Sequence, residues 1–354
     1  MSYLIDYQKY TLRFKFEAGT SRGVLTTKDT YFISIRDTQN PERVGIGEAS
    51  TLPGLSIDHV PYFEEKLQTT LTAIQEGATL AHLDLQHFPA IHFALEIAFQ
   101  DLQQGGKRQL FENDFSNGTA PIPINGLIWM GPKSIMLQQI KEKLAAGDRC
   151  IKLKIGAIDF EEELALLKYI RTQFGSEEVI VRVDANGAFK PEEALEKLKR
   201  LAELALHSIE QPIATQQWEK MAKLCEQSPL PIALDEELIG VVDRKALLAT
   251  IQPQYIILKP SLLGGWAASE AWIALAKKHN IGWWMTSALE SNIGLNAIAQ
   301  FTGNLSLHPT ATYQGLGTGQ LYHNNIPSPL EVNGGWLHYR SHVNWEVGDI
   351  TKPE

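Results

Sequence analysis

The amino-acid sequence predicts an α/β protein built from a (β/α)8-type barrel, a modified TIM barrel, and a smaller α+β domain. Apolar strand segments alternate with helical patterns from Pro121 onward, with about eight repeats in roughly 200 residues. These strand segments end in charged residues at nearly constant spacing. The first 115 residues instead combine alternating strands with two helical patterns. We therefore expect an N-terminal domain over residues 1–115 and a barrel over residues 120–324.

The N-terminal domain begins with two segments that alternate apolar and polar residues, at 11–16 and 30–37. This period of two predicts antiparallel strands of a small meander. The Gly-, Pro- and Ser-rich stretch at 45–56 predicts a loop. Two helical patterns follow at roughly 60–77 and 88–104. Strands followed by helices predict the α+β class for this part of the chain.

The barrel strands are short apolar segments, and most are followed by a helical pattern. They are PIPINGLIW, CIKLKIG, VIVRVDANG, SIEQPI, PIALDEEL, YIILKP and GWWMTSALE, with a weak last strand near Ala311–Tyr313. A doubly wound sheet is the structural alternative, but it does not place every polar strand end around a single centre. The tail, residues 325–354, is predicted to return to the N-terminal domain and complete it.

The composition is that of an ordinary globular enzyme. The chain has 354 residues, 44% of them hydrophobic, enough for one large core and a smaller one. The net charge of −9 argues against a nucleic-acid binder, which needs a basic stripe. The two cysteines, Cys150 and Cys225, form neither a disulfide framework nor a metal cluster. The N-terminus lacks a signal-peptide pattern and no long apolar run occurs, so we expect a cytoplasmic protein without a membrane span.

Charged residues at the strand ends carry the functional signal. Counted from Lys154, steps of 30, 26, 25 and 24 residues lead to Asp184, Glu210, Asp235 and Lys259. Since equivalent ends of consecutive barrel strands surround one mouth, these side chains are expected to share one pocket. Lysines and carboxylates together are the composition of a metal-assisted site that removes a proton from carbon.

Lys152 and Lys154 are two residues apart on one predicted strand, so both side chains point to the same face. Two lysines in a buried strand are costly unless they are paired or functional. The alternative is an edge strand with solvated lysines. Lys259 follows the apolar run YIIL and precedes Pro-Ser. The alternative interpretation of this residue is a helix-capping or surface lysine.

Asp184, Glu210 and Asp235 are weak signals one by one, because a turn or a helix cap explains an acid after a strand. Together they offer hard oxygen ligands that fit Mg²⁺ or Mn²⁺. Such an ion would polarise a substrate carboxylate and neutralise an enediolate. A neighbouring metal or cation lowers a lysine pKa toward the range of a general base.

The last strand ends supply candidate substrate contacts. Ser287 and Glu290 lie in TSALESNIG before a predicted helix, whose N-terminus favours a carboxylate. GLGTG, beginning at Gly315, brings backbone close to a ligand or is only a flexible connection. Asn186, two residues after Asp184, is a further candidate. The histidines do not cluster with the acids.

The KLK pair, the VDAN, IEQP and LDEE segments and Lys259 in ILKP resemble the enolase superfamily over essentially the full chain. Lysines on the second and sixth strands indicate its muconate lactonising enzyme-like subgroup, and SALESNIG with GLGTGQLY is most similar to the o-succinylbenzoate synthase family. The resemblance implies an N-terminal domain that caps the barrel mouth. Loops at Thr20–Leu25, which include Arg22, and at Ala49–Leu55 would then shape specificity.

The resemblance implies a lyase that dehydrates 2-succinyl-6-hydroxy-2,4-cyclohexadiene-1-carboxylate to 2-succinylbenzoate in menaquinone biosynthesis. Lys154 would be the base, Lys259 a cation near the ring, and Lys152 an added positive charge. Asp184, Glu210 and Asp235 would hold Mg²⁺ or Mn²⁺. Alternatives are an N-acylamino acid racemase, dipeptide epimerase or cycloisomerase, and a barrel that binds a carboxylate without turnover. GLGTG lacks the acid pair with which dipeptide epimerases hold an ammonium group. A homo-oligomer is left open.

Overall fold

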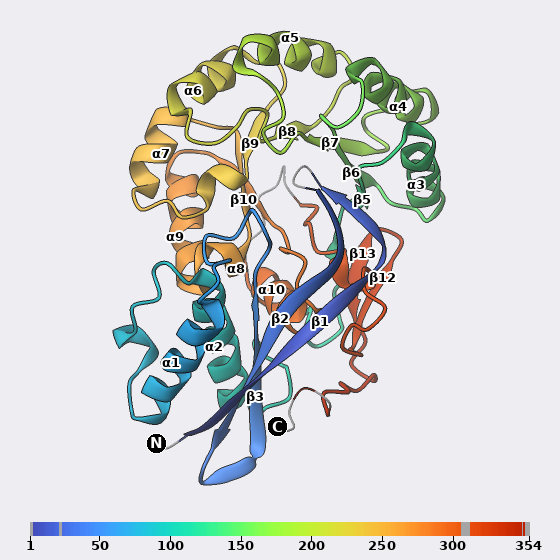
Figure 1. Ribbon diagram of the computed structural model, residues 1–354. Coiled ribbons are helices and arrows are strands. Elements are labelled where there is room, and N and C mark those ends of the chain that lie inside the picture. The colour runs from blue at the N-terminus through green and yellow to red at the C-terminus, as the bar shows by residue number, and fades with distance from the viewer. Residues whose placement is uncertain (1–2, 21–22, 306–311, 349, 351–354) are drawn as a thin grey trace.

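The computed structural model describes residues 3–20, 23–305, 312–348 and 350. An arc of parallel strands with helices on its outer side forms one half of the molecule, and an antiparallel sheet with two helices forms the other half (Figure 1). Within the described ranges, no helix is long and apolar enough to cross a membrane.

The N-terminal half is a three-stranded antiparallel sheet covered by helices. Its elements are β1 (Tyr3–Thr20), β2 (Gly23–Asp37), β3 (Asn40–Ser50), α1 (Phe63–Gln75), the short η1 (Leu80–His82) and α2 (Pro89–Gln103). The strand order is β1-β2-β3. The tip of the long β1–β2 hairpin reaches toward the concave side of the arc (Figure 1), and Gly19 forms a bridge to Met130 there.

The prediction of a loop at 45–56 is wrong in its first half, because β3 continues to Ser50. Its glycines are explained by close packing of α2 on the strand. A Cβ added at Gly47 would lie 1.9 Å from the carbonyl oxygen of Ala94, and one at Gly45 would lie 2.0 Å from that of Ala98. The glycines therefore permit contact between backbone and backbone rather than marking a turn.

The barrel sheet has seven parallel strands in the order β11-β10-β9-β8-β7-β6-β5. They are β5 (Gly126–Ile128), β6 (Cys150–Lys154), β7 (Ile180–Asp184), β8 (Ser208–Glu210), β9 (Ile232–Leu234), β10 (Tyr255–Leu258) and β11 (Gly282–Met285). The eighth position is reduced to two isolated bridges, Thr286 with Gly315 and Ile124 with Gln314. Ala311, part of the predicted eighth strand, lies outside the described residues.

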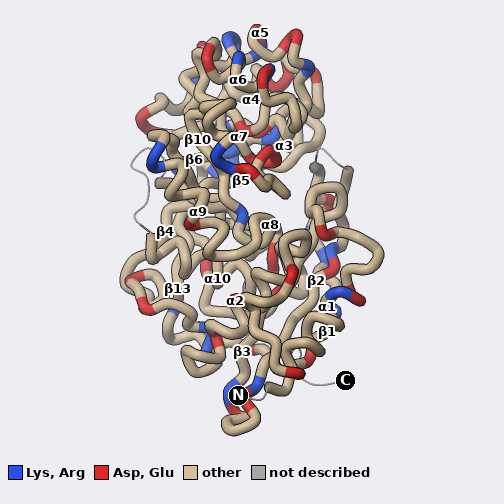
Figure 2. Tube along the Cα trace, turned by 90° about the vertical axis from the view of Figure 1, so that its left-hand side faces the viewer, with Lys and Arg blue, Asp and Glu red and all other residues tan. Residues whose placement is uncertain are grey.

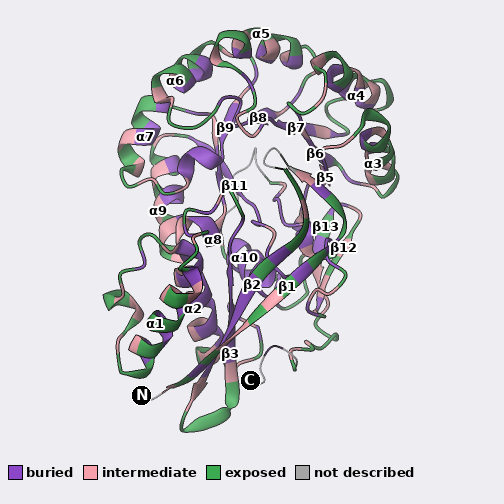
Figure 3. Cartoon of the chain, in the orientation of Figure 1, coloured by how far each residue is buried: buried purple, intermediate pink, exposed green. Residues whose placement is uncertain are grey.

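Helices cover the outer face of the sheet. They are α3 (Lys133–Ala145), α4 (Phe160–Gln173), α5 (Pro191–Ala202), α6 (Trp218–Gln227), α7 (Arg244–Ile251), α9 (Gly265–Lys278) and α10 (Asn292–Gly303). The short segments η2 (Glu236–Leu238), α8 (Pro260–Leu263) and η3 (Thr318–Gln320) follow β9, β10 and α10 along the chain. From α3 to α7 the inward faces are buried and the outward faces are exposed, whereas nearly all of α10 is buried (Figure 3). Basic and acidic residues are interspersed along the chain (Figure 2).

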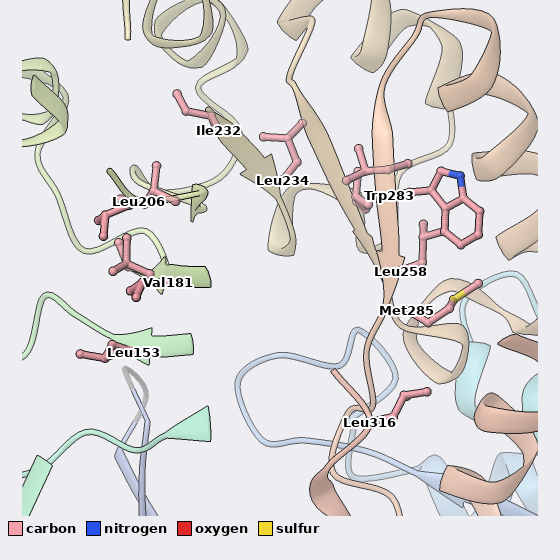
Figure 4. Close-up of a cluster of buried hydrophobic side chains, with 14 of the residues drawn as sticks. Leu153, Val181, Leu206, Ile232, Leu234, Leu258, Trp283, Met285 and Leu316 are labelled. Carbon is pink, nitrogen blue, oxygen red and sulfur yellow. The ribbon is translucent and has the colours of Figure 1, made fainter. Parts of the chain in front are cut away.

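Strand alternation separates the apolar core from the polar interior. Leu153, Val181, Leu234, Leu258 and Met285 belong to the large apolar core (Figure 4). Their neighbours one residue along, such as Lys152 and Lys154, therefore face the other side of the sheet. The core around the barrel thus fixes which strand residues enter its interior.

The tail contacts both halves of the molecule. Strand β12 (Leu330–Asn333) pairs with β13 (Trp336–Tyr339), and β13 pairs with β4 (Ile122–Pro123), at the start of the predicted first barrel strand. Ile326 and Ile350 instead pack with Phe32 and Ile46 of the N-terminal sheet. The division into 1–115 with 325–354 and 120–324 stays a prediction.

Glu96 lies at a contact between the two halves. Its carboxylate accepts a hydrogen bond from the backbone N–H of Trp266 at 2.7 Å, near the start of α9. Burial raises the pKa of Glu96 from 4.5 to about 7, and the nearby carboxylate of Glu270 adds to the rise. Burial lowers the pKa of the adjacent His92, so this histidine supplies no positive charge at neutral pH. Above neutral pH the Glu96 carboxylate is therefore charged although it is buried, and His92 does not offset this charge.

Glu96→Gln is expected to increase the free energy of unfolding at pH 8, by at most about 3 kcal/mol. Between the unfolded pKa of 4.5 and the folded pKa of about 7, the folded chain binds more protons, so its stability falls as the pH rises. The neutral amide avoids this loss, and the difference should shrink toward pH 5. Urea unfolding at pH 8 and pH 5 measures this difference in the free energy of unfolding. The exposed Glu76→Gln variant is the control. An equal effect of Glu96→Gln at both pH values would contradict the prediction.

Candidate active site

The predicted residues gather at the carboxyl ends of five neighbouring strands. Strand register places Lys154 beside Asp184 and Asp184 beside Glu210. Asp235 and Lys259 come directly after β9 and β10. Because parallel strands of a barrel share one open end, the even spacing in the sequence becomes one cluster in space. The three acids are 0–2% exposed.

Each lysine of the cluster contacts a carboxylate. Lys152 Nζ lies 2.8 Å from Glu210 Oε2 and 3.4 Å from Asp184 Oδ2. Lys154 Nζ lies 3.0 Å from the same Asp184 oxygen, and Lys259 Nζ lies 2.6 Å from Asp235 Oδ2. The prediction that these side chains face inward agrees with this geometry, and an edge strand with solvated lysines does not.

The electrostatics show that the acids are unequally compensated. Burial opposes the negative charge of Asp184, but Lys154 and Lys152 outweigh it and lower the pKa of this carboxyl. Burial raises the pKa of Glu210 to about 8, and Asp184 and Asp235 add to the rise against the effect of Lys152. Burial likewise raises the pKa of Asp235, despite the attraction of Lys259. Burial is thus the main reason that Glu210 and Asp235 disfavour their charged forms, while the lysines keep Asp184 charged.

The lysine charges are held by the same acids. Burial opposes the positive charge of Lys152, yet Glu210, Asp184 and Asp235 outweigh it and raise the pKa of its ammonium group. Burial also opposes the charge of Lys259, while Asp235 and Glu236 raise its pKa. Lys152 and Lys259 are thus cations in this arrangement.

The donor set fits a hard divalent cation. Asp184, Glu210 and Asp235 offer buried carboxylate oxygens at three neighbouring strand ends, and carboxylate oxygens are the ligands that Mg²⁺ prefers. Lysine ammonium groups contact these acids directly, and within the described ranges no three His, Cys, Asp or Glu side chains are arranged around one point. Binding an ion there requires the carboxylates to turn from the lysines toward the ion.

A cavity of about 830 Å³ opens above the cluster. Its polar floor includes Lys152, Lys154, Asp184 and Lys259. Its walls are largely apolar and come from both halves of the molecule: Phe16, Val24, Leu52, Leu55, Leu127, Trp129, Met130, Ile135, Leu289 and Leu321. A cavity of this size, with charged groups at its floor and apolar residues over much of its wall, suits a small organic acid with an apolar body.

Three of the predicted substrate contacts line this cavity: Asn186, Ser287 and Gly315. Asn186 accepts a hydrogen bond from Lys154 Nζ at 2.8 Å and donates one to Glu236 at 2.9 Å. Ser287 donates to Glu290 at 2.6 Å and accepts from Thr318 at 2.8 Å. A Cβ at Gly315 would lie 2.4 Å from the Thr286 hydroxyl oxygen, so glycine keeps this wall open.

The other predicted substrate contacts, Glu290, Thr20 and Arg22, are placed differently from these three. Glu290 is fully buried and does not line the cavity, because its carboxylate accepts hydrogen bonds from Ser287, Ser261 and the N–H of Ala288. It organises the loop rather than facing the cavity. Thr20 ends β1 at the hairpin tip beside Gly23, and Arg22 lies outside the described residues.

Sequence reasoning missed several residues at the cavity. Glu236 lines it beside Asn186, whereas a strand that continued past Asp235 would turn these two adjacent acids to opposite faces. The strand ends at Leu234 and a short turn follows, so Asp235 and Glu236 are both buried and alternation no longer applies. Thr286, which lines the cavity next to Ser287, was also missed. Its position directly after an apolar strand was the available signal.

Comparisons with known proteins agree with this architecture. A family model described as enolase C-terminal domain-like matches residues 136–342. The o-succinylbenzoate synthase of Desulfotalea psychrophila is 48% identical, over 94% of this chain and 98% of that protein. The crystal structure of MenC from the same organism has a TM-score of 0.82 at 45% identity, over 96% of this chain and all of that one.

A third relative is less similar. The N-succinylamino acid racemase of Thermus thermophilus is 35% identical, over 54% of this chain and 47% of that protein. The family model alone covers more than half of the present sequence, and the first relative matches nearly all of it. On these matches, and with lysines after two different barrel strands, the chain belongs to the enolase superfamily, in its muconate lactonising enzyme-like subgroup.

Proposed function

We propose that the chain is an o-succinylbenzoate synthase. It dehydrates 2-succinyl-6-hydroxy-2,4-cyclohexadiene-1-carboxylate to 2-succinylbenzoate in menaquinone biosynthesis. The observation that carries this proposal is the buried cluster of Lys154, Lys259 and three acids below a largely apolar cavity. The near full-length relative of the same activity supports the choice of substrate.

Lys154 is the proposed base. It lines the cavity, its side chain is 13% exposed, and its ammonium nitrogen lies between Asp184 and Asn186. A substrate proton above this nitrogen would pass to neutral Lys154 as the carbon–hydrogen bond breaks. In a syn elimination the hydroxyl leaves from the same face, so the protonated lysine can return that proton and release water. The ring becomes aromatic, which drives the second step.

Asp184, Glu210 and Asp235 are the proposed ligands of a divalent ion, Mg²⁺ with Mn²⁺ as an alternative. When bound, the ion supplies a Lewis acid next to the substrate carboxylate. Lys152, which contacts two of these acids, adds positive charge on the same side. Lys259 lies at the end of a different strand and is held as a cation by Asp235, so it is placed to stabilise negative charge that spreads into the ring.

A racemase, epimerase or cycloisomerase is the second candidate, favoured by one observation. Lys154 and Lys259 end strands that are not neighbours in the sheet, so they can approach one carbon from two sides. The Gly315–Gly319 segment, however, contains no acid to hold the ammonium group of a dipeptide.

We also infer a cytoplasmic location, and a homo-oligomer stays open.

An assay of both activities tests the proposal. The purified chain with Mg²⁺ should convert the cyclohexadiene to 2-succinylbenzoate, followed by the ultraviolet absorbance of the two rings. N-succinylamino acids and dipeptides in D₂O should exchange their α-proton far more slowly. Fast exchange without dehydration would assign the isomerase reaction instead. Binding with neither reaction would indicate a barrel that only binds carboxylates.

A further inference from the structure

The loop between β11 and α10 contains a residue with an unfavourable backbone at the cavity wall. Leu289 has a φ of +62°, in the left-handed region that bulky residues rarely adopt. Its half-buried side chain lines the cavity and packs on an apolar cluster that includes Leu52 and Ala288. The fold therefore keeps Leu289 in a backbone conformation that leucine disfavours. The residue lies at a point of the cavity wall where a substrate would contact its side chain.

Two side chains from outside the loop hold the carbonyl group of Leu289. Lys28 Nζ donates to this oxygen at 2.9 Å, and the hydroxyl of Tyr322 donates to it at 2.7 Å. Lys28 lies on β2 of the N-terminal sheet, and Tyr322 follows η3. The two donors are 3% and 2% exposed, so water competes little for these hydrogen bonds.

The burial of Lys28 calls for an explanation beyond packing. A lysine is almost never buried unless it is paired. Burial lowers the pKa of Lys28, and the carboxylates of Glu48 and Glu290 oppose that effect without cancelling it. Lys28 also donates to the hydroxyl of Ser50. An apolar side chain would be easier to bury here, so the lysine contributes through its hydrogen bonds, one to Ser50 on the same sheet and one to the Leu289 carbonyl on the barrel loop.

The residues on either side of Leu289 are anchored separately. Glu290 accepts a hydrogen bond from the N–H of Ala288 at 2.8 Å, and Glu48 accepts one from the N–H of Ser291 at 2.8 Å. Glu48 also accepts from Gly294 at 2.8 Å, in the first turn of α10. The N–H of Leu289 donates to the Ser287 hydroxyl at 3.0 Å, so the contacts of Lys28 and Tyr322 with the carbonyl fix the remaining backbone group of this residue.

We propose that Lys28 and Tyr322 are positioning residues that set substrate specificity. They hold the backbone of Leu289 in the left-handed conformation, and its side chain then forms an apolar wall against the body of the substrate. The inference rests on the proposed function only for the identity of that body, the cyclohexadiene ring. It assigns a role in the reaction to two residues that do not themselves touch the substrate.

A double-mutant cycle tests this role. Lys28→Met removes the donor but keeps the length of the side chain, and should lower kcat/KM about tenfold, the size expected from one hydrogen bond of a charged group. Most of the loss should appear in KM, because the wall contacts the substrate before and during reaction. Leu289→Gly adopts the same backbone without help. Adding Lys28→Met to it should change kcat/KM by less than about twofold.

Tyr322→Phe, which removes one hydroxyl, should show the same pattern with a smaller effect and serves if Lys28→Met folds poorly. Lys9→Met, on the exposed face of β1, removes an ion pair with Asp29 and should leave kcat/KM unchanged. If Lys28→Met lowers kcat/KM by the same factor in the unmodified chain and in the Leu289→Gly variant, the two sites act independently. That result would overturn the proposal.

A structural measurement keeps the inference separate from the proposed function. A crystal structure of the Lys28→Met/Tyr322→Phe variant should show Leu289 outside the left-handed region. A φ that stays near +62° would overturn the positioning role. If the unmodified enzyme fails to dehydrate the cyclohexadiene, the proposed function fails, and this structure still decides the role of Lys28 and Tyr322.

Discussion

Lys154→Ala is expected to lower kcat/KM for dehydration by about 10⁴-fold, the upper range for loss of a general base. Lys154 lies at 3.0 Å from Asp184 and 2.8 Å from Asn186 and faces the cavity, so its removal takes away the proton acceptor. The fold should remain, because Asp184 keeps its contact with Lys152. Steady-state kinetics and a thermal melt measure the two outcomes.

Arginine variants distinguish the two lysines of the cavity. Arginine stays protonated and cannot act as a base, so Lys154→Arg should be as inactive as Lys154→Ala. Lys259→Arg keeps a cation near Asp235 and should retain part of the activity that Lys259→Ala loses. The exposed Lys168→Ala on α4 is the control and should be fully active. Substantial turnover by Lys154→Ala would exclude Lys154 as the base.

Removal of divalent ions is expected to abolish turnover, and Mg²⁺ should restore it. Three buried carboxylates at neighbouring strand ends form the proposed ligand set. Binding should also stabilise the fold, by about 2.7 kcal/mol when the free ion exceeds its Kd a hundredfold. A thermal melt with and without Mg²⁺ therefore reports binding independently of catalysis.

Glu210→Gln should remove both the activity and the stabilisation by Mg²⁺, since an amide cannot supply the charge of the third acid. The exposed Glu226→Gln on α6 is a matched control that should keep the full response. Activity that survives exhaustive chelation would refute the metal role. A Glu210→Gln variant that Mg²⁺ stabilises as strongly as the unmodified enzyme would exclude Glu210 as a ligand.

Much of the fold was predictable because its signals are local. Alternation of strands and helices predicted the barrel, and period-two alternation predicted that Lys152 and Lys154 share a face. The β3 strand was missed because Gly45 and Gly47 look like turn residues until α2 is placed against them. The weak eighth strand predicted near Ala311–Tyr313 begins outside the described residues, and in the described part that follows the backbone forms single bridges at Gln314 and Gly315.

The sequence by itself determined the lysines and acids of the site, through a fixed pattern: the residue after each apolar strand lies at the same end of the barrel. Only the tertiary structure decided the walls. Leu289 looks like an ordinary core residue in the sequence, and Lys28 lies 261 residues from the carbonyl that it holds. No local pattern encodes such a contact, because it depends on how the N-terminal sheet docks on the barrel. The residues of the proposed chemistry therefore follow from the order of the strands in the sequence. The residues of the proposed specificity come together only where the two halves of the molecule meet.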